Sequence, residues 1–209
     1  SRSETFIEGG GNPCVDDLPH DTGVGTVGFA NGEDGKGMRG IAWNTTLISL
    51  KVMTAKLNEF GRLVRIISPD AVIKAFRHIN QMADAGETLI VVAAFVYDGV
   101  DPVLDEILKD LERKGNVYIV ASSDNIRGLN SKAQPALPCS ASTLSNVDCV
   151  ASRNANGELA LWSSFGDAIT QTGYCDNIVA GYPGDWYGNF LGNSGCVPQI
   201  AALASLVWG

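Results

Sequence analysis

The sequence predicts one α/β domain in which helices flank a central, mostly parallel sheet. Short apolar runs alternate with helical patterns between residues 46 and 121, and strand–helix–strand connections of this type make neighbouring strands parallel. Start and stop signals delimit the helical patterns. The length of 209 residues suits a single domain, so we assign residues 1–209 to one domain.

The first predicted helix begins at a histidine. Residues 21–30 are a run of small residues that can pack closely as a helix, with His20 presented at its start. Residues 46–53 then alternate in part between apolar and polar side chains, as a mostly buried strand does.

Two further helices carry capping signals. Ser68 and Asp101 each precede a proline and are predicted N-caps. Gly86 and Gly115 end the two apolar repeats that follow. Between these helices, residues 88–96 form a nearly continuous apolar run, which is typical of a strand covered on both faces.

The rest of the chain continues the alternation. Residues 117–121 form another apolar strand. Residues 147–152 and 159–162, on either side of an Asn-Gly turn, predict a hairpin. Residues 197–208 have a helical and almost wholly apolar pattern, which predicts a buried helix.

Composition excludes two kinds of partner. Fifteen basic residues against 23 acidic ones give a net charge of −8, without any block of Lys and Arg, so nucleic acid is not an expected partner. The longest apolar run, residues 89–97, is far shorter than the roughly 20 residues that span a bilayer. We therefore expect a soluble chain without a membrane span.

The five cysteines favour disulfides over a metal site. They have no C-x-x-C spacing and no neighbouring histidine, so zinc is not expected. Scattered cysteines in a lysine-poor chain fit an oxidising compartment, which predicts one or two disulfides and a leftover thiol; buried thiols are the alternative. Cys139 and Cys149 bracket a short loop and are the predicted pair. The odd count also permits a bond to another polypeptide.

Three polar residues fall where chemistry could occur, because sites in parallel sheets form at the carboxyl ends of the strands. His20 could act as a general base, or be a loop histidine without a role. Ser194 precedes the last helix, where backbone N–H groups favour negative charge, although an N-cap serine would also suit this position. Asn125 follows a strand, and its amide could donate to an oxyanion or simply form a turn.

Four motifs have the order and spacing found in a known enzyme family. His-Asp-Thr-Gly-Val occupies residues 20–24, and Gly-Ile-Ala-Trp-Asn-Thr-Thr-Leu begins the segment 40–53. Residues 121–125 start with Ala and end with Asn, and Gly-Asn-Ser-Gly-Cys-Val-Pro occupies residues 192–198. Together they resemble the motifs of subtilisin-like serine proteases (subtilases) over almost the whole chain. The resemblance implies the three-layer subtilisin-like fold.

The resemblance also implies a role for each polar residue. Ser194 would be the nucleophile, His20 the general base, and Asn125 the oxyanion donor beside the backbone N–H of Ser194. The implied reaction is hydrolysis of a peptide bond through an acyl-enzyme.

The substrate site and the cofactors follow from the same resemblance. Ala94, Phe95 and Val96 stand where the family has a Gly-rich strand edge that accepts a peptide, and their bulk implies a narrow or reshaped pocket. No cofactor is expected to be required. Structural calcium is frequent in the family, but the sequence has no carboxylate cluster with ligand spacing.

The family's orienting aspartate and the C-terminal end of its fold are expected to be missing. In the family this aspartate lies on a strand well before the histidine, in a stretch that the sequence does not contain. Asp16 and Asp17 lie in loop-like sequence, and Asp21, next to His20, is expected to point elsewhere. We therefore expect another polypeptide chain to supply the aspartate.

Two hypotheses of function follow. The first is a secreted serine endopeptidase, processed from a zymogen and nicked into chains that stay together; residues 1–5 are polar, lack an initiating Met and look like a cut site. The second is a catalytically impaired binding protein or toxin subunit on the same fold. Labelling of Ser194 by a fluorophosphonate would separate them.

Overall fold

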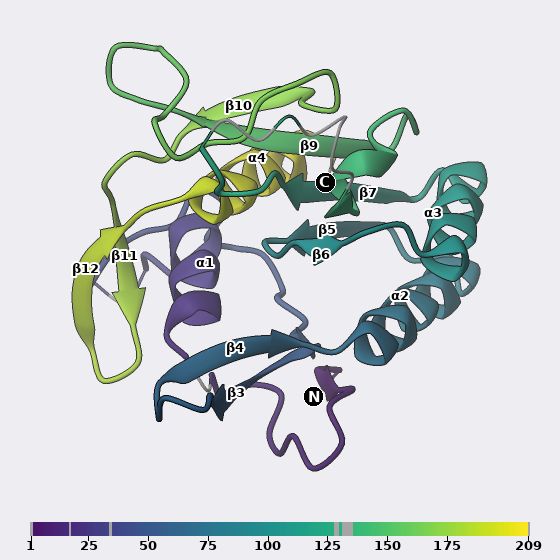
Figure 1. Cartoon of the computed structure of the whole chain (residues 1–209), viewed down its shortest axis with the longest axis horizontal. Coiled ribbons are helices and arrows are strands. Elements are labelled where there is room, and N and C mark those ends of the chain that lie inside the picture. Colours follow the sequence, from purple (N-terminus) through teal and green to yellow (C-terminus); the bar gives the residue numbers. More distant parts are fainter. Residues whose placement is uncertain (1, 17, 34, 128–129, 131–135, 209) are drawn as a thin grey trace.

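A parallel sheet lies at the centre of the computed structural model, which describes residues 2–16, 18–33, 35–127, 130 and 136–208 (Figure 1). The sheet has four strands in the order β10-β9-β7-β5, and each pairing is parallel. The strands are β5 (Leu89–Ala93), β7 (Val117–Ser122), β9 (Val147–Arg153) and β10 (Gln171–Tyr174). The predicted α/β class is therefore confirmed.

Helices cover both faces of this sheet (Figure 1). On one face, α2 (Pro69–Asp84) and α3 (Pro102–Lys114) bury Phe76, Leu104 and Leu108 against alternate residues of β7 and β9. On the other face, α4 (Cys196–Trp208) packs on the remaining alternate residues, and α1 (His20–Phe29) packs on α4. This arrangement gives the three layers that the sequence predicts.

The predicted helix starts are confirmed in detail. Ser68 Oγ accepts a hydrogen bond from the N–H of Ala71 at 3.3 Å, and Asp101 Oδ1 accepts one from the N–H of Val103 at 2.9 Å. Gly115 ends α3 with a φ of 72°, a left-handed conformation that glycine adopts without strain.

Four two-stranded sheets surround the central one. They are β1 (Glu4–Thr5) with β2 (Leu50–Lys51), β3 (Met53–Leu57) with β4 (Leu63–Ile67), β6 (Tyr97–Asp98) with β8 (Ala136–Leu137), and β11 (Ile178–Tyr182) with β12 (Trp186–Phe190). The first pair is parallel and the other three are antiparallel.

Two strand predictions are wrong in part. Residues 46–53 form only β2 and the first residue of β3 rather than one strand. The predicted hairpin does not form a two-stranded sheet: β9 pairs in parallel with β7 and β10, and residues 159–162 contribute one bridge, between Leu159 and Arg153. A parallel sheet offers β9 two long neighbours, so the local turn does not decide its pairing.

One burial prediction is confirmed and another is wrong. The apolar run 88–96 forms a strand only over β5, which lies at the edge of the sheet, but both faces of that strand are covered: Leu89 and Val91 pack against one core, and Ile90 and Val92 against the other. In α4 only the first half is buried, while Leu206 and Val207 are largely exposed. Apolar patterning indicates which side chains can be buried, but neighbouring elements decide which ones are.

The cysteines form two disulfides. The predicted bond between Cys139 and Cys149 is confirmed, a second one joins Cys175 to Cys196, and Cys14 is free and exposed. No helix in the described ranges is long and apolar enough to cross a membrane.

Candidate active site

Ser194 lies in a short 3₁₀ helix, η2 (Asn193–Gly195), directly before α4. The preceding Gly192 has a φ of 114°, and a Cβ there would lie 3.1 Å from the side-chain oxygen of Asn125. Ser194 is only 8% exposed, and its Oγ donates a hydrogen bond to the carbonyl oxygen of Ala94 at 3.2 Å. The hydroxyl therefore lies at the carboxyl end of β5 and at the start of a helix.

A buried amide fixes the Ser194 loop. Asn193 is fully buried, and its Nδ2 donates to Ser123 Oγ at 2.7 Å and to the carbonyl oxygen of Asp124 at 2.8 Å. Its Oδ1 accepts from Ser163 Oγ at 3.0 Å. Neither Asn193 nor Ser163 was predicted from the sequence to have a role; for Asn193, a polar residue shortly before an apolar helix was the available signal.

Asn125 is tied to the same loop. Its Oδ1 accepts a hydrogen bond from the backbone N–H of Asn193 at 2.7 Å. Because this contact engages the oxygen of the amide, the Nδ2 group is left as a donor at the exposed end of β7. Asn125 and Ser194 are thus brought to one rim of the sheet, as an oxyanion donor and a nucleophile would need to be.

His20 begins α1, and its side chain is 12% exposed. Its Nδ1 lies 2.9 Å from Oδ1 of Asp21, so the expectation that Asp21 points elsewhere is wrong. A carboxylate accepts a hydrogen bond from Nδ1–H, which leaves Nε2 of a neutral imidazole free to accept a proton. The Asp21 side chain is 59% exposed, so solvent screens this pair.

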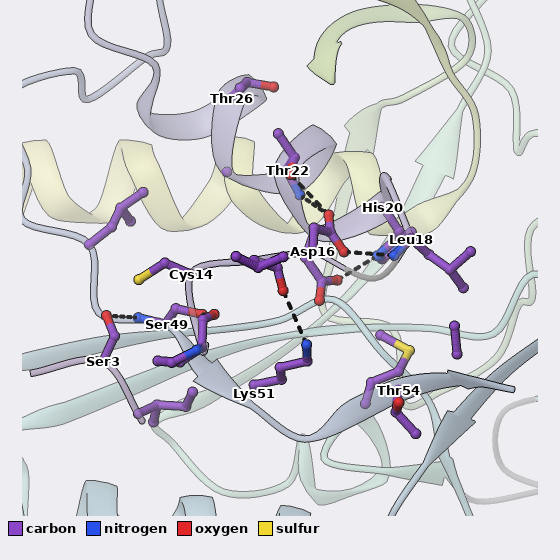
Figure 2. Close-up of a pocket in the computed structure, with 18 of the residues that line it drawn as sticks. Ser3, Cys14, Asp16, Leu18, His20, Thr22, Thr26, Ser49, Lys51 and Thr54 are labelled. Atoms are coloured by element: carbon purple, nitrogen blue, oxygen red, sulfur yellow. Dashed lines mark hydrogen bonds and ion pairs between the residues drawn. The ribbon is translucent and has the colours of Figure 1, made fainter. Parts of the chain in front are cut away.

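Asp16 holds the start of α1 rather than the histidine ring (Figure 2). Its Oδ2 accepts from the backbone N–H and from Oγ1 of Thr22 at 2.7 and 2.9 Å, and its Oδ1 accepts from the N–H of Leu18 at 3.2 Å. These bonds cap the helix, where N–H groups lack partners and negative charge is favoured. Asp17 lies outside the described residues.

One phenylalanine contacts both halves of the site. The ring of Phe190 lies 5.5 Å from the ring of His20, centroid to centroid, and a Cβ on Gly195 would lie 3.0 Å from Phe190 Cδ1. Helix α1 also packs against η2. Phe190 therefore lies next to His20 and next to Gly195, the residue that follows Ser194.

The three predicted substrate-binding residues follow β5. Ala94 accepts the hydrogen bond of Ser194, so it touches the candidate nucleophile. Phe95 packs against the core beneath α2 and α3, and Val96 is half-buried. Of the three, only Ala94 is shown in contact with Ser194.

A cavity of about 400 Å³ opens beside His20 (Figure 2). His20, Asp21, Asp16 and Lys51 of β2 are among the residues that line it. In the described part of the chain, no group of three or more His, Cys, Asp or Glu side chains could hold a metal ion.

Two curated sequences share about a quarter of their aligned residues with this chain. Subtilisin-like protease 1 of Plasmodium falciparum is 26% identical over 223 residues, which covers 97% of this chain and 30% of that protein. The thermophilic serine proteinase of Bacillus sp. (strain AK1) is 26% identical over 188 residues, which covers 90% of this chain and 42% of that protein. The chain thus spans less than half the length of either relative. No protein-family model matches the sequence.

Solved structures with the same fold are also proteases. Sphericase superimposes with a TM-score of 0.75 at 22% identity, covering 93% of this chain and 64% of its own. The S41 psychrophilic protease gives a TM-score of 0.75 at 23% identity with the same coverage. The chain has the α/β subtilisin-like fold, and the resemblance seen in its motifs is confirmed. Its sequence and its fold are similar to those of subtilisin-like serine proteases.

Proposed function

We propose that this chain carries the nucleophile and the general base of a serine endopeptidase. The observation that carries the proposal is that the Phe190 ring lies against His20 and close to Gly195, the residue after Ser194, while Asp21 contacts Nδ1 of the imidazole. The family resemblance supplies the reaction class, which is peptide-bond hydrolysis.

In the proposed mechanism Ser194 Oγ gives up its proton and attacks the carbonyl carbon of a peptide. The hydroxyl leaves its hydrogen bond to Ala94 by rotating about its Cα–Cβ bond, and Nε2 of His20 takes the proton. The oxygen of the tetrahedral intermediate is stabilised by Asn125 Nδ2. The proton then passes from His20 to the leaving amine. In the second half of the reaction His20 takes a proton from water, the water attacks the acyl-enzyme, and His20 returns the proton to Ser194 Oγ.

Asp21 is the carboxylate that this chain offers to His20. Its bond to Nδ1 favours the tautomer in which Nε2 is the base. Because the carboxylate is exposed, it orients the ring less firmly than a buried partner would. The proposal still includes an aspartate supplied by another chain of a nicked assembly. That aspartate would be a second carboxylate near His20, in addition to Asp21.

The setting of this enzyme is also proposed. Two disulfides are consistent with an oxidising compartment, which supports secretion. Processing from a zymogen would suit a protease made of several chains. A peptide segment lying along Ala94, Phe95 and Val96 would place its carbonyl near Ser194, because Ala94 already touches that hydroxyl.

A fluorophosphonate probe tests the proposal. It should modify wild-type chain at Ser194, as identified by peptide mapping, and the Ser194→Ala variant should stay unmodified. Ser205→Ala, which removes a serine in the second half of α4, is the matched control and should label like wild type. A folded wild-type chain that resists the probe would favour the second hypothesis, a binding protein on a protease fold.

A further inference from the structure

The hairpin of β3 and β4 ends in three exposed apolar side chains. Leu57 and Leu63 face each other in the last pair of the ladder and are 69% and 52% exposed, and Phe60 in the turn between them is 76% exposed. We call these three residues the apolar tip. The hairpin lies at the periphery of the molecule, with its turn directed away from the central sheet (Figure 1). Single exposed apolar side chains are ordinary, but a group of them on one turn indicates a contact surface.

The backbone of the turn is suited to an environment with little water. Oδ1 of Asn58 accepts hydrogen bonds from the N–H groups of Phe60 and Arg62 at 3.0 and 2.9 Å. The N–H of Asn58 donates to the carbonyl of Arg62 at 2.8 Å, and the N–H of Gly61 donates to the carbonyl of Asn58 at 2.9 Å. Unpaired backbone donors are costly outside water, so these internal bonds let the apolar tip leave water at lower cost.

Basic side chains surround the apolar tip. Lys56 and Arg65 project from opposite faces of the hairpin, and Arg62 belongs to the turn; all three are exposed. Within the described ranges none of the three takes part in a salt bridge. The hairpin contains one acidic residue, Glu59, so its net charge is +2, whereas the whole chain has a net charge of −8. The charge of this region is therefore complementary to an anionic partner.

A lipid surface fits the apolar tip better than a folded protein does. Phe60, at the end of the turn, is the most exposed of the three residues, so the apolar tip protrudes and a protein partner would need a pocket of matching shape. The interface of a bilayer is fluid, takes up apolar side chains and offers phosphate groups to basic ones. We propose that the apolar tip inserts into the interface of an anionic lipid bilayer, with Lys56, Arg62 and Arg65 on the lipid phosphates.

The length of the hairpin separates the apolar tip from the acidic remainder of the chain. β3 and β4 have five residues each, which corresponds to roughly 17 Å at the usual rise per residue. The Debye length at physiological salt is only about 8 Å. Repulsion between the anionic lipid and acidic groups beyond the base of the hairpin is therefore largely screened.

The same hairpin borders the candidate active site. Met53, Ala55 and Arg65 line the cavity beside His20. A hairpin held at a bilayer would keep this cavity close to polypeptide segments that lie near the membrane. This consequence rests on the proposed function, whereas the membrane contact itself does not.

Sedimentation of the whole chain with phospholipid vesicles tests the proposal. Wild type should bind vesicles of phosphatidylcholine with about one-third phosphatidylserine about tenfold more tightly than vesicles of phosphatidylcholine alone, because basic residues gain from the negative surface. Raising the salt concentration from about 0.1 M to about 1 M should remove most of this difference, since the Debye length falls from about 10 Å to about 3 Å.

Matched variants test whether the hairpin makes the contact. Leu57→Gln should weaken binding to the phosphatidylserine vesicles about fivefold, while Leu161→Gln replaces a leucine that is also 69% exposed and should bind like wild type. Arg62→Glu should weaken binding about tenfold, while Arg77→Glu makes the same change of charge on the exposed side of α2 and should have less than about a twofold effect. Urea denaturation verifies that all four variants are folded.

Four results would overturn the proposal. Two are the absence of wild-type binding to phosphatidylserine vesicles and equal weakening by Leu57→Gln and Leu161→Gln. A third is binding of a soluble glutamate-rich peptide that requires Leu57 and Arg62, which would identify an acidic protein as the partner. The fourth is self-association without lipid that Leu57→Gln abolishes, which would identify a second copy of this chain. Fluorophosphonate labelling of Ser194 in solution is independent of all four.

Discussion

The two halves of the candidate site are built differently. The Ser194 loop is held by the fully buried Asn193, by Asn125, and by a disulfide from Cys196 two residues further on. The His20 half borders a cavity, and the carboxylate that touches its ring is mostly exposed. The comparison indicates that this chain rigidly positions Ser194 by itself, whereas His20, the proposed base, has room for an additional contact.

The largest effect should come from removing the buried amide. Asn193→Leu removes the partner of Ser123 Oγ and one of the partners of Ser163 Oγ, so the free energy of unfolding should fall by about 3–4 kcal/mol. Asn189→Leu, at an exposed position of β12, should change it by less than about 0.5 kcal/mol. Urea denaturation measures both, and equal effects would show that the Asn193 contacts do not fix the Ser194 loop.

The contribution of each disulfide to the free energy of unfolding should increase with the length of the loop that it closes. The bond between Cys175 and Cys196 closes 21 residues, and the bond between Cys139 and Cys149 closes 10. Because a crosslink lowers the entropy of the unfolded chain, replacing the first pair with alanine should lower the free energy of unfolding by about 3 kcal/mol. Replacing the second pair should lower it by about 0.6 kcal/mol less. Only the first replacement should also slow labelling of Ser194, since Cys196 begins the helix that follows it.

Two glycines of α1 allow the contact between the halves to be tested. A Cβ on Gly28 would lie 2.8 Å from the carbonyl oxygen of Pro198, so Gly28→Ala pushes α1 away from α4 and should cost about 2 kcal/mol. Gly25 has nothing within 4 Å of the same position, and Gly25→Ala should stabilise the helix by about 0.5 kcal/mol. Thermal denaturation distinguishes them, and a destabilising Gly25→Ala would contradict the packing.

The smallest expected effect concerns Asp21. Removing the exposed carboxylate by Asp21→Asn should slow labelling of Ser194 about tenfold, because Nδ1–H of His20 loses a charged acceptor. Asp70→Asn removes another acid from the first turn of a helix, α2, and should leave labelling unchanged. If the Asp21 variant labels at the wild-type rate, the pair does not orient His20.

Sequence patterns predicted the parts of the molecule that local chemistry determines. The caps at Ser68 and Asp101, the small-residue helix at His20 and the pairing of Cys139 with Cys149 are signalled by nearby residues, and each is confirmed. The motif order also led to the right fold. These features depend on a few adjacent side chains or on spacing along the chain.

What the sequence could not predict depends on neighbours far along the chain. The run 88–96 is packed on both faces as expected, but no local pattern indicated that β5 lies at the edge of the sheet beside a cavity. Asp21 was expected to point away from His20. Adjacency in the sequence does not show how a side chain is rotated, so their contact could not be predicted. The buried partners of Asn193 lie 30 to 70 residues away in sequence, so no local pattern contains them.

The rate at which a fluorophosphonate modifies Ser194, compared between wild type and His20→Ala, tests the central claim most directly. If His20 takes the serine proton, the variant should react at least about a hundredfold more slowly while unfolding at an unchanged denaturant concentration. Rates within twofold of each other would show that the imidazole and the hydroxyl do not work together.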